Sequence, residues 1–373
     1  MRAGSRIAIA NADWLRRTLK LPPAIRKKAT PIDGRVRQLA NDLVLKDIRL
    51  PVKLDSEQQP LLFQLYNQEL TKRLQERRLL LPNFDKAGAV CIFSDYGGES
   101  SDSRYLTYTF TFVDYDFLTL NYREAIKEIR EEHGLQNPYK EIAFKDLSYG
   151  PIQRALPSYL EMLDKSVNGL VFTLLVDKKV LSLLGENKKQ TLELAAEQMR
   201  ELGFGRLRPK TVEKLQRILL TLSYFTHLLV PTGKKIFWMT DHDSIVANSE
   251  TAQQTSQMYS NAIHSFLNVK YDPVGFVTPF DKGTDEMFAD LLSVSDLVAG
   301  AVEHYFTRKS TMTDLTVSQG ANQILMWLAR QAVVLKKLCI MVFVDDSGFR
   351  VGTVDFHLVN PPDHINEIEI YFP

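Results

Sequence analysis

Residues 89–116 contain two β-strand patterns joined by a glycine-rich turn, and this pair constrains the fold more than any other feature of the chain. The first pattern, "AVCIFSD" (89–95), is apolar almost throughout, and the second, "RYLTYTFTFVDYD" (104–116), alternates and is rich in Thr, Tyr and Phe. Residues of these types favour strands. Gly97 and Gly98 suit the loop of an antiparallel hairpin, so a β-sheet is predicted at the core.

Strand and helix patterns then alternate along the chain. Short apolar runs end in an acid at "GLVFTLLVD" (169–177) and "KKIFWMTD" (234–241), and further short strands are expected at 140–147 and 275–277. Helical spacing is found at 122–133, 151–165, 249–267, 286–306 and 317–337, and a hairpin pattern follows at 338–357. This alternation predicts an α/β protein with a mixed sheet flanked by helices.

The same patterns divide the chain into three parts. Residues 1–85 are expected to be a helical N-terminal extension, in which 61–81 has apolar residues at helical spacing. Residues 86–310 form the predicted sheet domain, with a helical insertion at 180–230. Residues 311–373 supply a helix and a β-hairpin that are expected to pack on this core.

The composition indicates a globular protein of a reducing compartment. The chain has 373 residues, 45% of them hydrophobic, and a formal net charge of +1, so it can bury a large core without disulfides. Cys91 and Cys339 are its two cysteines, and each lies in an apolar run, which indicates buried thiols. We find no run of about 18 apolar residues and no signal peptide, and therefore expect a cytoplasmic protein outside the membrane. The oligomeric state and any protein partner stay open.

Several ligand-binding motifs are missing from the sequence. There is no Gly-Lys-Ser/Thr phosphate loop and no dinucleotide-binding glycine motif. The seven histidines do not form pairs at the helical spacing of metal ligands, and neither cysteine has a neighbouring histidine. These observations argue against nucleotide-loop, zinc and cysteine-nucleophile chemistry.

Acidic residues occur where a sheet could bring them together. Asp95 and Asp241 follow predicted strands, and Glu141 begins another. Several converging carboxylates are what two-metal hydrolysis of a phosphodiester requires, and oxygen ligands suit Mg²⁺ or Mn²⁺. An aspartate after a strand is equally typical of a turn or a helix N-cap, so each residue also has a purely structural interpretation.

Asp296 is the least ordinary of the acids. In "LLSVSDLVAGAV" it lies on a predicted helix whose other residues are apolar on nearly all sides. A charge in such a place needs a partner, which is either a metal ion or a buried Arg or Lys.

Basic residues gather at the start of another predicted helix. The segment "GFGRLRPKTVEKLQR" (203–217) contains Arg206, Arg208 and Lys210, followed by Lys214 and Arg217. Such a cluster either contacts a nucleic-acid backbone or forms a solvated helix face.

Four motifs together resemble a known family, the domain of unknown function numbered 3800. They are "FSDYGG", "KEIAFKDLS", "IFWMTDHD" and "SVSDLVAGAV", and the resemblance extends over about residues 89–306. The last motif is the most specific, since 296–301 matches the family pattern almost residue for residue. The family is RNase H-like in fold, so the resemblance implies an RNase H-like mixed sheet.

The resemblance also implies a function and a site. It points to a metal-dependent nuclease acting on DNA or RNA with Mg²⁺ or Mn²⁺, in a bacterial defence or mobile-element system. By resemblance the catalytic and metal-binding acids are Asp95, Glu141, Asp241 and Asp296. Asp243 and Asp177 are rivals for the third position.

Two departures from the family pattern leave a second function open. Tyr96 stands where the family usually has a glutamate, and Ala143 where it usually has a lysine; the nearest lysine is Lys145, a further candidate for nucleic-acid binding. The alternative is therefore a catalytically degenerate RNase H-like module that binds nucleic acid or protein.

Overall fold

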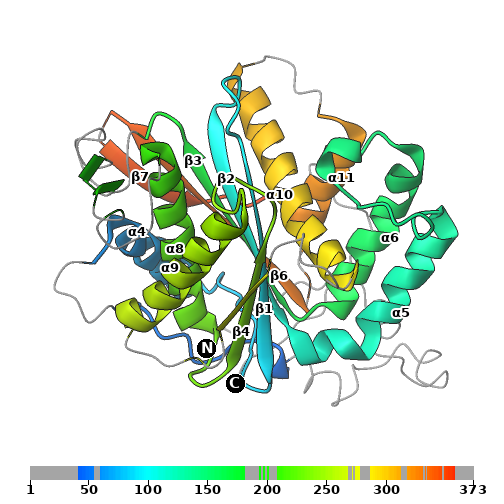
Figure 1. The fold of residues 1–373 in the computed structure, drawn as a ribbon, viewed down its shortest axis with the longest axis horizontal. Coiled ribbons are helices and arrows are strands. Elements are labelled where there is room, and N and C mark those ends of the chain that lie inside the picture. The colour runs from blue at the N-terminus through cyan, green and yellow to red at the C-terminus, as the bar shows by residue number, and fades with distance from the viewer. Residues whose placement is uncertain are drawn as a thin grey trace, which may run out of the picture.

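In the computed structural model the chain forms a seven-stranded mixed β-sheet with helices on both faces (Figure 1). The structure describes residues 41–53, 59–180, 208–267, 274–277, 286–311, 317–330, 334–346 and 348–357, with isolated positions between them. The first 40 residues of the expected N-terminal extension, and most of 180–207 in the expected insertion, lie outside the described residues.

The strand order of the sheet is β5-β4-β1-β2-β3-β6-β7. The strands are β1 (Ala89–Gly97), β2 (Tyr105–Asp114), β3 (Gly169–Asp177), β4 (Lys235–Thr240), β5 (Val274–Val277), β6 (Leu335–Asp345) and β7 (Gly348–Thr353). Strands β1, β2 and β3 are antiparallel neighbours, β4 is parallel to β1, and β5 is parallel to β4. These five strands have the order and directions of the RNase H-like fold, which confirms the expected fold class. Strand β6, parallel to β3, and β7, antiparallel to β6, extend the sheet beyond them.

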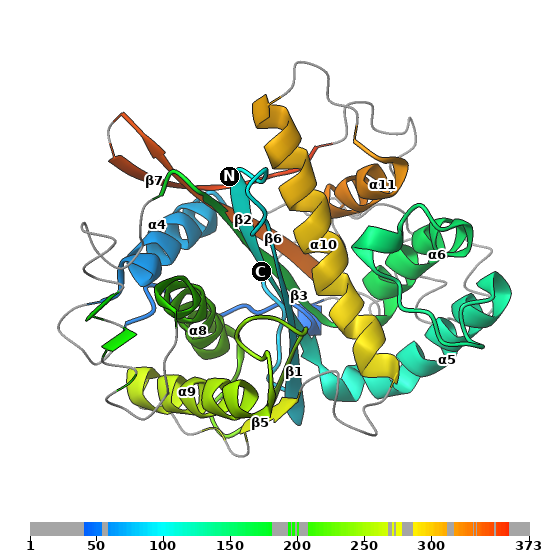
Figure 2. The ribbon, with the colours of Figure 1, turned by 45° about the horizontal axis from the view of Figure 1, so that its top comes forward.

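Two helical layers cover the sheet (Figure 2). One face carries α4 (Leu61–Gln75), α8 (Pro209–Leu229) and α9 (Ser249–Leu267). The other carries α5 (Tyr115–His133), α6 (Gly150–Ser166), α10 (Glu286–Thr311) and α11 (Gln319–Leu328), together with the 3-10 turn η1 (Phe144–Asp146). We call these the α8 face and the α10 face.

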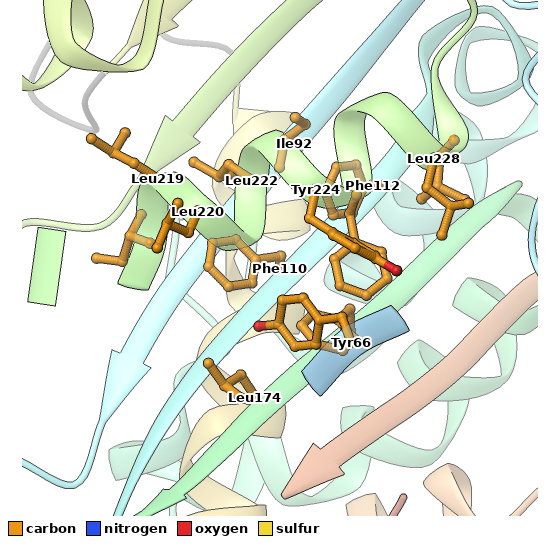
Figure 3. Packing of buried hydrophobic residues seen from close by; sticks show 14 of the residues in the cluster. Tyr66, Ile92, Phe110, Phe112, Leu174, Leu219, Leu220, Leu222, Tyr224 and Leu228 are labelled. Atoms are coloured by element: carbon orange, nitrogen blue, oxygen red, sulfur yellow. The ribbon is translucent and has the colours of Figure 1, made fainter. Parts of the chain in front are cut away.

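Aromatic residues fill the core of the α8 face (Figure 3). The rings of Phe172 on β3 and Phe225 on α8 lie 4.0 Å apart, and Tyr66 of α4 packs edge-on against both. The Tyr66 hydroxyl is hydrogen-bonded to Thr221 at 2.8 Å. The described part of 180–230 is therefore a core helix, since α8 joins α4 to the sheet.

Three expected elements differ from the structure at their ends. The helix expected at 61–81 ends at Gln75, because Arg77 takes a left-handed conformation with φ 57°. The helix expected from 122 begins at Tyr115, because the Asp114 side chain accepts hydrogen bonds from the first N–H groups of α5. The helix expected over 317–337 stops at Leu328, and Lys337, which belongs to β6, donates to the carbonyl of Trp327 at its end.

The strand expected at 140–147 was wrong. This segment is an extended loop followed by η1, and it lies among the helices of the α10 face instead of joining the sheet. Side chains bind its backbone groups: Arg130 donates to the Lys140 carbonyl at 2.9 Å, and Asp296 accepts from the Phe144 N–H at 2.6 Å. Ile142 and Ala143, which are adjacent, are both buried, so the apolar residues of this segment reflect burial without strand pairing.

Among the described helices, none combines the length and the apolar character that a membrane crossing demands.

Lys336, at the start of β6, is a buried lysine whose titration makes stability depend on pH. It is 2% exposed and donates to the carbonyls of Leu43 and Val334 at 2.7 and 3.1 Å. Burial lowers the pKa of its ammonium group from 10.5 to about 7. Between these values the unfolded chain holds the proton and the folded chain does not, so the free energy of unfolding rises with pH.

We therefore predict that Lys336→Met removes a stability gain that the wild-type chain shows between about pH 7 and pH 9. The difference in unfolding free energy between the two proteins should change with pH by at most about 1.4 kcal/mol per unit, as one proton allows. Denaturant titrations at several pH values measure it. Lys127→Met, at an exposed helical position, is the control and should leave the pH dependence of wild type intact; equal slopes in all three proteins would contradict the prediction.

Candidate active site at the carboxyl ends of strands β1 and β4

Strands β1 and β4 place Asp95 and Asp241 side by side. The two strands are parallel, and Ser94 is the register partner of Thr240. The Asp241 N–H then donates to the Ser94 carbonyl at 3.2 Å, so Asp241 lies level with Asp95 along the strand direction. Neighbouring strands are about 4.8 Å apart, which brings the two carboxylates to one edge of the sheet.

Helix α10 brings Asp296 to the same edge because it packs closely on the sheet through small residues. Ser295 donates to the Phe93 carbonyl at 3.0 Å, and Thr107 donates to the Ala299 carbonyl at 3.3 Å. The Asp95 and Asp296 carboxyl groups are hydrogen-bonded to each other. A bond between two carboxyl groups requires that one of them keep its proton.

Turn η1 holds Asp296 from the other side and brings Glu141 near. The Phe144 N–H donates to Asp296, and the Phe144 ring lies over Gly300, one turn further along α10. A Cβ atom at Gly300 would lie 2.3 Å from this ring. The glycine of "SDLVAGAV" is therefore needed for the turn to approach the helix, and Glu141 lies three residues before Phe144.

A buried ion pair fixes the loop that carries Glu141, and sequence reasoning missed it. Arg130 on α5 pairs with Asp290 on α10, and both are 2% exposed. The same guanidinium donates to the Lys140 carbonyl and lies 4.1 Å above the ring of Tyr139, whose hydroxyl donates to Asp290 at 3.2 Å. Asp290 on α10 is thus an acid with a buried arginine partner. The apolar residues around Asp290 in the sequence were the signal that could have revealed this ion pair.

Burial and mutual repulsion raise the pKa of three of the acids. Burial, then the charges of Asp296 and Asp241, hold the pKa of Asp95 well above its usual value. Burial raises the pKa of Asp296, and the hydrogen bonds from Phe144 and Asp95 oppose this shift. Burial, then Asp241 and Asp296, raises the pKa of Glu141, while Lys145 lowers it. The structure therefore brings all four predicted acids together, and Lys145 lies within electrostatic reach of two of them.

The donor set of this carboxylate cluster, which we define as Asp95, Glu141, Asp241 and Asp296, consists of hard oxygen atoms. Such atoms suit Mg²⁺ or Mn²⁺ and are poor ligands for soft metals. As the side chains stand, no group of three or more acidic, histidine or cysteine residues within the described chain is arranged to hold a metal ion. The chemistry of the donors fits a divalent cation, whose charge would replace the proton between Asp95 and Asp296.

Tyr96 points away from the cluster. Successive residues of a strand face opposite sides, so Asp95 faces the α10 layer and Tyr96 the α8 layer. Its hydroxyl is hydrogen-bonded to Ser94 at 2.7 Å and to Thr240 at 3.2 Å, and so connects β1 to β4 directly beneath the two aspartates. The tyrosine at position 96, where the family usually has a glutamate, therefore does not deprive the cluster of a carboxylate.

Neither rival for the third position lies with the four acids. Asp243 pairs with Lys214 of α8, which also pairs with Glu99 and lies 5.0 Å from the ring of Tyr96. Asp177 is 3% exposed at the end of β3 and pairs with Arg104 at 3.2 Å. Lys214 thus ties together the two loops that follow Asp95 and Asp241.

The basic segment divides into exposed and buried residues. Arg208 and Lys210, at the start of α8, are exposed, as is Lys145 beside the carboxylate cluster. Arg206 lies outside the described residues. Lys214 and Arg217 are buried and paired with acids, so within the described chain the accessible charge of this segment is that of Arg208 and Lys210.

Comparison with known proteins adds little to this geometry. No family model matches the chain, and no curated protein does either. Among solved structures, the chain is similar to ribonuclease H2 from Pyrococcus horikoshii OT3, at 13% sequence identity and a TM-score of 0.31. The match covers 64% of this chain and 85% of that chain.

We predict that Asp95→Asn stabilises the protein in the presence of a chelator. The variant removes one of two buried, repelling carboxyl groups, and the amide can still bond to Asp296. Because the folded-state pKa of Asp95 lies above that of the unfolded chain, wild-type stability falls as pH rises through this window. The advantage of the variant should therefore grow from pH 5 to pH 8.

Chemical denaturation with a chelator at both pH values measures the difference. Asp85→Asn, at an exposed position, is the matched control and should show no such gain. A loss of stability in Asp95→Asn at pH 8 would show that the carboxylate makes a net favourable contribution, contrary to this interpretation.

Proposed function

We propose that this protein is a phosphodiesterase that cleaves nucleic acid and depends on Mg²⁺ or Mn²⁺. The observation that carries the proposal is the meeting of Asp95, Glu141, Asp241 and Asp296, which come from two strands, a loop and a helix far apart in the sequence. Four acids at one edge, three with raised pKa, are more than turns or caps need. The order of the four motifs supports the same function by resemblance to the family numbered 3800, and a place in a defence system remains a prediction from it.

The roles of the residues follow from their surroundings. Bound divalent ions would supply charge to stabilise the attacking and leaving oxygens of the phosphodiester. The charges of both Asp296 and Asp241 act on Asp95, so Asp95 would be the central metal ligand. Asp241 and Asp296 would complete the set of metal ligands. Glu141 is partly buried with a raised pKa, so it is suited to accept a proton from the attacking water.

Basic side chains flank the cluster on both sides of the sheet. Lys145 lies next to Glu141 and Asp296, where its charge would attract a phosphate group. Arg208 and Lys210 begin the helix whose Lys214 binds the loops beyond Asp95 and Asp241. A nucleic-acid backbone that approaches the cluster from either face of the sheet would therefore lie near positively charged side chains.

Cleavage assays test the proposed reaction. The protein is incubated with single- and double-stranded DNA and RNA in Mn²⁺, in Mg²⁺ and in chelator. We expect metal-dependent cleavage by wild type and a loss of at least about a hundredfold in Asp95→Asn and Asp296→Asn, because each removes a charged ligand.

The matched control is Asp102→Asn in the exposed loop between β1 and β2, which should cleave like wild type. Binding of nucleic acid without cleavage by every protein, in either metal, would exclude the nuclease and support the alternative of a degenerate binding module.

Tyr96 provides a second test, as a positioning residue. Its hydroxyl holds β1 and β4 together beneath Asp95 and Asp241, so Tyr96→Phe should weaken Mn²⁺ binding about tenfold, in the range typical of residues that orient metal ligands. Isothermal titration calorimetry with Mn²⁺ measures the affinity.

The control is Tyr108→Phe on the neighbouring strand. Tyr108 lies opposite Tyr96, and its hydroxyl accepts a hydrogen bond from Arg217 at 3.1 Å without linking β1 to β4. Both variants should lose about 1 kcal/mol of stability. Equal Mn²⁺ affinities in the two variants would mean that Tyr96 has a structural role only.

A further inference from the structure

A second candidate site lies on the same face of the sheet as the carboxylate cluster, two to three strands away from it. It is a cavity of about 310 Å³ between the end of α4, strands β3 and β6, the end of α11 and residues 354–357. Thr173 and Cys339, in its wall, are two and three strands away from Asp95 along one register row. None of the four clustered acids lines it.

Charged side chains gather in the cavity wall. Four cationic side chains line it, and Asp355 is its acidic residue; the cations are Arg73, Arg77, Arg78 and Lys337. Two of the cations have further counter-charges nearby, since Lys337 pairs with Asp164 and Arg78 lies 3.7 Å from Glu76.

Two arginines converge on one carboxylate in the wall. Arg73 donates to both oxygens of Asp355, at 2.9 and 3.0 Å, and Arg78 donates to one of them at 2.6 Å. Arg73 is 8% exposed, and its buried Nε–H has no hydrogen-bond partner. An arginine pair of this geometry is suited to bind a carboxylate or phosphate group.

The backbone conformation of Arg77 determines where Arg78 lies. Arg77, which also lines the cavity, is the non-glycine residue with positive φ in the described part of the chain. This conformation ends helix α4, and the Arg78 N–H donates to the Arg73 carbonyl at 2.9 Å. It turns the chain back so that Arg78 reaches the same carboxylate as Arg73.

The rest of the cavity is apolar. Its lining includes Val171, Val302, Leu328, Val354 and Phe356. The volume is near the lower limit of small-molecule pockets, so it suits a single ring with one anionic group. Residues 354–357 also line the cavity, and the Val354 N–H donates to the Cys339 carbonyl at 2.8 Å.

We propose that this cavity binds a small organic anion, with a phosphate monoester or carboxylate on an apolar ring. The anionic group would take the place of the Asp355 carboxylate between Arg73 and Arg78, and the ring would lie against the apolar wall. The carboxylate of Asp355 would therefore compete with the ligand for Arg73 and Arg78. The proposal does not depend on the nuclease function.

Calorimetric titration of the full chain tests the proposal with three probes. Phenyl phosphate and phenylacetate distinguish the two anionic groups, and inorganic phosphate shows whether the ring contributes. We expect saturable binding of at least one ring-bearing probe, tighter than that of inorganic phosphate. Asp355→Asn should bind it about tenfold more tightly, because the competing charge is gone, and Arg78→Ala about tenfold more weakly.

Two control variants make the outcome specific. Asp345→Asn also removes an acid paired with an arginine, Arg350, and should bind the probe like wild type. Asp95→Asn should do so too, which separates this cavity from the carboxylate cluster. The proposal is overturned if no probe binds, or if Asp355→Asn and Asp345→Asn change the affinity equally; neither result bears on metal-dependent cleavage.

Discussion

The close packing of α10 on strands β1 and β2 is the constraint on which the rest of the site depends. Small residues, Ser295 and Ala299, let the helix approach the strands closely enough to bond to their backbone and threonine side chains. Asp296 is thereby held beside Asp95, although two buried carboxylates repel each other. The many apolar contacts of this helix offset that repulsion, which a solvent-exposed helix could not do.

The two faces of the sheet have different tasks at the candidate site. The α10 face carries the carboxylates, and the ion pair of Arg130 with Asp290 holds the loop of Glu141 there. The α8 face holds the strand ends in register, through the hydroxyl of Tyr96 and the ammonium group of Lys214. A residue one position from a proposed ligand can therefore matter for geometry without contacting the metal.

Much of the fold was predictable, because strand patterns report burial directly. The hairpin of β1 and β2, strand β3 and strand β4 lie close to where alternation and apolar runs placed them. Residues 140–147 show the limit, because a short apolar run buried in a loop resembles a short strand in the sequence, and only hydrogen-bond partners distinguish them. The ends of α4 and α11 were also mispredicted. The left-handed conformation of Arg77 ends α4. Lys337, from β6, bonds to the end of α11, and helical spacing in the sequence does not report such a long-range contact.

The sequence by itself determined which residues could serve as ligands and that two of them, Asp95 and Asp241, would follow β-strands. It also required that Asp296 have a partner, because a charge inside an apolar helix is costly. Only the tertiary structure decided what that partner is: Asp95 and the Phe144 N–H, with no ion pair to a lysine or arginine among the described residues. Partners so far apart in the chain are brought together by packing, and a sequence pattern records only that burial occurs.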